Sequence, residues 1–81
     1  MIKIRGLVHD EDLISCVISD SSEHGRSFAI LFQMDGLKPA SEIPEGCRGA
    51  VRKALPAIRS ALTENRVPPV SAGRSATLSV G

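Results

Sequence analysis

Residues 13–34 read LISCVISDSSEHGRSFAILFQM and contain two runs of alternating side chains. The even-numbered positions of both runs, 13–19 and 27–34, are apolar or cysteine. A period of two is typical of a β-strand that buries one face and leaves the other in solvent. The polar, glycine-containing segment 20–25 between the runs is typical of a loop. The stretch therefore predicts two neighbouring strands joined by a hairpin.

The N-terminal segment continues this pattern. Ile2, Ile4 and Val8 share one face of the expected strand. Gly6 falls on the same face, where a glycine marks a bend or a bulge. The polar residues 9–12 then break the alternation and predict a turn. Three strands joined in succession by short connections predict an antiparallel meander.

A helical pattern follows in residues 44–65. Four apolar residues recur there at intervals of four, three and four positions, as on one side of an α-helix: Val51, Leu55, Ile58 and Leu62. Pro56 lies in the middle, where a proline removes one backbone hydrogen bond and costs about 3 kcal/mol. We therefore expect a helix that is kinked or broken at Pro56 and packs its apolar side on one face of the sheet.

These elements predict a single α+β domain over residues 1–66, a three-stranded antiparallel meander followed by the helix. Its core is expected to contain the larger apolar side chains of all four elements: Ile4, Ile14, Ile18, Ile30, Phe32, Val51, Leu55, Ile58 and Leu62. Residues 67–81 are rich in proline, glycine and serine and are expected to form an extended or partly disordered tail. The alternation of residues 76–80 leaves a short fourth strand as the alternative.

Charge is divided unequally along the chain. Residues 1–47 carry eight carboxylates and four basic groups, whereas residues 48–81 carry six basic groups and one carboxylate. If the helix extends far enough, four arginines fall within about 40° of one another beside its apolar side: Arg48, Arg52, Arg59 and Arg66. Such a stripe can bind an acidic protein or a phosphate backbone. The alternatives are that the arginines cover apolar surface or pair with the acidic turn 10–12.

The second face of the expected sheet is also partly apolar. It carries Leu13, Val17 and Leu31, and a single helix on the other face leaves these side chains uncovered. Uncovered apolar patches often mark interaction sites. Either the tail covers this face, or a protein partner does. A second copy of the chain is one such partner, and its binding would make the protein a homodimer.

Residue types that carry chemistry do not form a recognisable set. Cys16 and Cys47 are far apart, and with two histidines they lack the spacing of a zinc site. The turn 9–12 lacks the spacing and the glycine of a calcium loop, and neither a GxSxG nor a phosphate-loop sequence occurs. We expect no enzyme activity, no metal and no cofactor. No apolar run has the length of a signal peptide or a membrane span, so we expect a cytoplasmic protein without a membrane partner.

The sequence thus favours a small non-enzymatic protein–protein interaction module, such as an adaptor, a regulator or an inhibitor. Its docking surface would be the arginine-bearing border of the helix, the second sheet face, or both. The alternative is a nucleic-acid-binding protein that uses the four arginines as phosphate contacts. Against this alternative stand a formal net charge of +1 and the presence of only two aromatic residues, Phe28 and Phe32, for base stacking.

Overall fold

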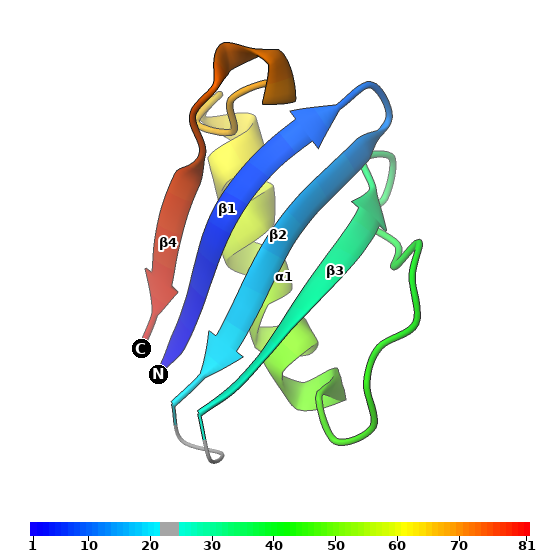
Figure 1. Ribbon diagram of the computed structural model, residues 1–81, viewed down its shortest axis with the longest axis vertical. Coiled ribbons are helices and arrows are strands. Elements are labelled where there is room, and N and C mark those ends of the chain that lie inside the picture. The colour runs from blue at the N-terminus through cyan, green and yellow to red at the C-terminus, as the bar shows by residue number, and fades with distance from the viewer. Residues whose placement is uncertain (22–24) are drawn as a thin grey trace.

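The computed structural model describes residues 1–21 and 25–81, so the centre of the expected loop 20–25 lies outside the described residues. Within those residues the protein has two layers, a four-stranded antiparallel sheet and one α-helix that covers one face (Figure 1). The sheet has the strand order β3-β2-β1-β4, with β1 (Ile2–Asp10), β2 (Leu13–Asp20), β3 (Arg26–Gln33) and β4 (Ala76–Val80). Helix α1 spans Arg48–Thr63, and a short 3₁₀ helix, η1, spans Val70–Ala72. The expected α+β fold is confirmed.

The first three strands form the expected meander. Asp10 pairs with Leu13 across a two-residue turn, Glu11 and Asp12, in which Glu11 takes a positive φ of 53°. β2 then pairs with β3 along its whole length without a shift in register. Because paired residues share a face, the even-numbered residues of β2 and β3 all turn toward the helix. The alternation in the sequence therefore predicted the inner face of these two strands correctly.

In β1 the expected face is correct at Ile2 and Ile4 but wrong at Val8. The pairing with β2 shifts between Arg5 and Val8, and Gly6 in this bulge has a φ of 62°. The extra residue of the bulge turns Leu7 into the core, where it is fully buried, and moves Val8 to the opposite face. The bulge expected at Gly6 thus changes the side on which every later residue of β1 lies.

Helix α1 runs without a break through Pro56, so the expectation of a helix split at this residue is not met. Proline has no N–H to donate to the carbonyl of Arg52, one turn earlier. Both residues are exposed, so water can bind that carbonyl in place of the missing donor. After Thr63 the chain turns through Asn65, which has a φ of 55°, and the amides of residues 65 and 66 bond back to the last turn. This is the Schellman arrangement that ends many helices.

The buried side of α1 is centred on alanines. Ala54 and Ala61 are fully buried, and so is Ile58, whereas Leu55 and Leu62 are only half-buried. Alanines let the helix backbone approach the sheet closely. On an ideal helix, this moves the centre of the buried side by about 60° from the stripe expected from the larger side chains. The other seven expected core residues are buried.

The C-terminal segment joins the sheet. β4 pairs antiparallel with β1, from Ile2–Val80 to Leu7–Ala76, and buries Leu78 against the core. The preceding chain is fixed as well, because Val67 is buried and the amide of His9 donates to the carbonyl of Pro68 at 3.0 Å. The short fourth strand, which the sequence offered as an alternative, is confirmed.

Candidate functional site

The face of the sheet opposite α1 is open to solvent (Figure 1). Leu13 and Leu31 on this face are 38% and 37% exposed. They lie diagonally across β2 and β3, since Leu31 pairs with Ser15 and Leu13 with Gln33. Further apolar side chains on the same face extend this cluster. We call the set the open-face patch: Val8, Leu13, Val17, Ala29 and Leu31.

The C-terminal segment does not cover the open-face patch. It forms β4 at the edge of the sheet, beside β1, and so widens the open face. Ser79 pairs with Lys3 and adds a small polar side chain to that face. Of the two alternatives for covering this face, the tail is therefore ruled out. The sequence-predicted residues Leu13, Val17 and Leu31 do lie together, and the bulge at Gly6 adds Val8 to them.

Three of the four sequence-predicted arginines lie together on the other layer. Arg48, Arg52 and Arg59 are exposed on α1, and their guanidinium groups form no ion pair or hydrogen bond with a described residue. Because the buried side of α1 is centred on alanines, these arginines lie about 130° from its centre on an ideal helix. They therefore point mainly into solvent, and the expectation that they border the buried side is wrong.

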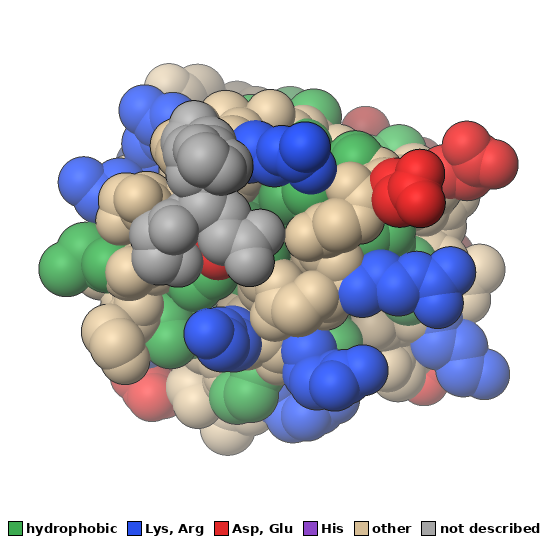
Figure 2. Space-filling model, turned by 90° about the horizontal axis from the view of Figure 1, so that it is seen from below, with side chains coloured by type: hydrophobic (Ala, Val, Ile, Leu, Met, Phe, Trp, Pro, Cys, Tyr) green, Lys and Arg blue, Asp and Glu red, His purple; other side chains and the backbone are tan. Residues whose placement is uncertain are grey.

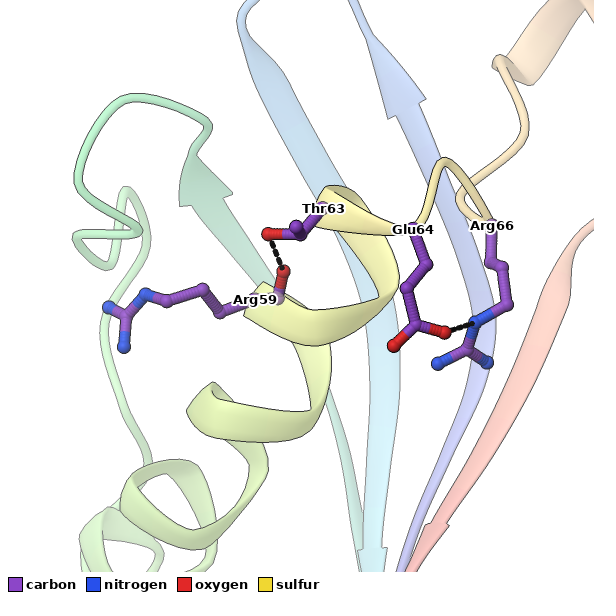
Figure 3. Close-up of polar contacts among 4 residues, drawn as sticks. All are labelled: Arg59, Thr63, Glu64 and Arg66. Carbon is purple, nitrogen blue, oxygen red and sulfur yellow. Dashed lines mark hydrogen bonds and ion pairs between the residues drawn. The ribbon is translucent and has the colours of Figure 1, made fainter.

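Arg66 does not belong to this group. The helix ends at Thr63, and Arg66 Nε pairs with Glu64 Oε1 at 2.9 Å, on the side of the helix away from Arg59 (Figure 3). Thr63 Oγ1 donates to the backbone carbonyl of Arg59 in the last turn (Figure 3). The pair between Arg66 and Glu64 is the only ion pair within the described part of the chain, so the alternative that the arginines pair with the turn 10–12 is not observed there.

The cysteines are buried free thiols. Cys16 lies in β2 and Cys47 immediately before α1. Burial raises the pKa of the Cys16 thiol to about 11, so at neutral pH it carries its proton and is a poor nucleophile. Across residues 1–21 and 25–81, no group of three His, Cys, Asp or Glu side chains is placed to hold a metal ion. In the same residues, α1 is too short and too polar to cross a bilayer.

No family model, curated protein or solved structure matches this chain. Function is therefore inferred from the chemistry of its surfaces. Sequence reasoning missed one part of the open face, where Lys3 and Arg5 of β1 lie beside Ser19 and Ser27. These residues come from three strands, and only the pairing register brings them together. The signal in the sequence was the alternation of Lys3 and Arg5 with Ile2 and Ile4, which placed both cations opposite the core.

Proposed function

We propose that this protein is a non-enzymatic protein–protein interaction module that docks a partner protein through the open-face patch. The observation that carries the proposal is the pair of exposed leucines, Leu13 and Leu31, on a sheet face that nothing in the described chain covers. Apolar side chains that cluster on a solvent-facing surface often mark a site where another molecule binds.

The energetic argument concerns the two leucines. Packing within the sheet already removes more than half of the surface of each leucine from water. A bound partner would remove the rest of that surface from water. At roughly 25 cal/mol per Å² of apolar surface, completing the burial of both side chains contributes on the order of 2 kcal/mol. The two side chains together thus contribute about as much as one interface hot-spot residue. An adaptor, regulator or inhibitor needs such a surface and no catalytic group.

The test is capture of partners from the native host, with nuclease treatment, by the unmodified protein and by two variants. Leu13→Ser combined with Leu31→Ser removes the apolar centre of the patch. Val70→Ser is the matched control, because Val70 is 52% exposed but lies on η1. We expect the double variant to lose bound protein while the control retains it. Equal recovery by both variants, with circular dichroism showing that both are folded, would contradict the proposal.

Self-association is tested on the same variants. If the partner is a second copy, sedimentation velocity at rising concentration should show a dimer for the unmodified protein and for Val70→Ser, but not for the double variant. A monomer at all concentrations would assign the patch to a different protein.

The helix arginines support a second candidate, binding to nucleic acid. Three exposed guanidinium groups without a described partner are suited to phosphate contacts. Replacing Arg52 and Arg59 with Glu should lower the affinity for DNA duplexes of any sequence and reduce the slope of log K against log salt by about 2. Fluorescence anisotropy of a labelled duplex measures both. Absence of binding by the unmodified protein at physiological salt would exclude this candidate.

A cytoplasmic location is part of the proposal. Cys16 and Cys47 are both free, and free thiols persist in reducing compartments. Thiol titration of the denatured protein, purified from its host without reductant, should find two reactive groups. An intramolecular or mixed disulfide would argue for an oxidising compartment instead.

A further inference from the structure

A hollow of about 350 Å³ opens on the sheet face beside the open-face patch. We call it the basic hollow, and its polar lining comes from β1, from β2 and the residue after it, and from β3: Lys3, Arg5, Ser19, Ser21 and Ser27. It lies toward the end of the sheet where both chain termini are found. Figure 2 views that end and shows Lys and Arg side chains over much of it, with the most prominent Asp and Glu side chains at the margin. The lining contains two basic side chains and no described carboxylate.

Three of the polar side chains of the basic hollow, those of Arg5, Ser19 and Ser27, are linked by hydrogen bonds. Arg5 Nη2 donates to Ser19 Oγ at 3.2 Å, and the Ser19 hydroxyl donates to Ser27 Oγ at 3.2 Å. Ser27 therefore keeps its own hydroxyl proton for another acceptor. Lys3 pairs directly with Ser19 across the strands, so its ammonium group extends from the same row. Neither Lys3 nor Arg5 forms an ion pair with a described residue.

These groups suit a dianionic oxyanion. A phosphate monoester carries a charge of about −1.5 to −2 at neutral pH and three strong acceptor oxygens. Two cations match that charge, while the free N–H groups of Arg5 and the hydroxyl of Ser27 can donate to its oxygens. A carboxylate brings a single charge and would leave one cation uncompensated.

We propose that the basic hollow binds the phosphate group of a phosphorylated protein segment, whose neighbouring apolar side chains lie on the open-face patch. The two surfaces are continuous, because Arg5 pairs directly with Val17 of the patch and Ser19 is two positions further along β2. This inference rests on the proposed function and names the chemistry of the partner. Phosphorylation of the partner thereby becomes the signal that this module recognises.

The test uses the full chain labelled with ¹⁵N and titrated with O-phosphoserine at neutral pH, followed by NMR. We expect saturable shifts of the amides of Lys3, Arg5, Ser19 and Ser27, with a dissociation constant on the order of 1 mM for the isolated amino acid. Arg5→Gln should weaken binding about five- to ten-fold, since a charge-assisted contact is lost. Arg59→Gln is the matched control, an exposed arginine on the opposite layer, and should bind as the unmodified protein does.

Three outcomes would overturn the proposal. The first is a phosphoserine titration without a specific site, seen either as a linear, non-saturating response or as equal affinities for Arg5→Gln and Arg59→Gln. The second is equal binding of acetate, which would assign the basic hollow to carboxylates. The third is a single-stranded DNA oligonucleotide that binds tighter than phosphoserine through the same amides, which would assign it to phosphodiesters.

The titration is independent of partner capture. Loss of phosphoserine binding leaves the apolar docking proposal standing, because Leu13→Ser and Leu31→Ser test that proposal with no phosphate added. Conversely, if the basic hollow binds phosphate but the open-face patch binds no partner, phosphoserine should still give saturable shifts. Partner capture should then recover no protein that depends on Leu13 and Leu31. Ser19→Ala adds a milder change, which removes only the hydroxyl that holds Arg5 and should weaken phosphoserine binding less than Arg5→Gln does.

Discussion

Replacing Pro56 with alanine should stabilise this protein. Pro56 is an interior residue of α1, and its side chain is exposed. Alanine at this position restores a donor for the carbonyl of Arg52 and removes the clash of the ring with the preceding turn. Since the ring has little packing to lose, the substitution changes the backbone of the helix and leaves the core side chains in place.

The magnitude follows from two opposing effects. Proline is about 3 kcal/mol less favourable than alanine inside a helix. Proline also restricts the unfolded chain, so its removal returns about 0.4–1 kcal/mol of conformational entropy to the unfolded state. The expected net gain in unfolding free energy is about 2 kcal/mol. For a domain of this size, such a gain raises the melting temperature by roughly 8–16 °C.

Urea and thermal unfolding followed by far-UV circular dichroism measure this gain. Ser60→Ala is the matched control, an exposed position of the same helix with an ordinary backbone, and should gain at most about 0.5 kcal/mol. A Pro56→Ala variant no more stable than the unmodified protein would refute the reasoning. It would mean that proline at this position does not cost α1 the roughly 3 kcal/mol expected inside a helix.

Two further predictions concern the core. Ile30→Ala, at a residue 2% exposed, should cost about 2–4 kcal/mol in urea unfolding, whereas Leu62→Ala, at a half-buried residue, should cost only about 1–2 kcal/mol; equal losses would contradict the observed rotation of α1. Burial raises the pKa of Cys16 in the folded protein to about 11, against an ordinary value of 9.0. The folded state therefore binds the thiol proton more tightly than the unfolded state does. The stability that this difference contributes is complete below pH 9 and is lost as the pH rises toward 11. Unfolding free energies measured across this window should fall less for Cys16→Ala, and identical slopes would show that Cys16 does not titrate as its burial requires.

Alternation and helical periodicity were sufficient to predict the meander, the helix and their order. Alternation failed in β1, where one extra residue shifts the pattern of inward-facing and outward-facing side chains. The bulge at Gly6 inserts a residue into β1, so Leu7 lies in the core, and Val8, which strict alternation assigns to the core, lies on the opposite face. β4 was only an alternative because five alternating residues carry little information, and its formation depends on the free edge of β1. A sequence does not display that edge until the other strands have been placed.

The orientation of α1 was mispredicted for a different reason. The positions of the larger apolar side chains predicted a buried side that includes Leu55 and Leu62. Close contact between the helix and the sheet instead favours the small side chains of Ala54 and Ala61. The arginines turned away from the sheet as a consequence. For the candidate site, alternation correctly placed Leu13 and Leu31 together on the second face. The basic hollow could not be predicted, because its members lie on three strands and meet only through their register.

The candidate docking surfaces on the sheet and the candidate surface on the helix can be occupied independently. The open-face patch and the basic hollow lie on the sheet, while Arg48, Arg52 and Arg59 extend from the helix layer on the other side. A standard interface covers about 800 Å² of each partner. The chain exposes 5167 Å², so a partner on the sheet leaves the helix arginines accessible. Variants in one layer should therefore leave binding at the other unchanged, as expected for distant sites without shared contacts. A protein bound on the sheet and a polyanion bound on the helix would then make this small domain a bridge between two molecules.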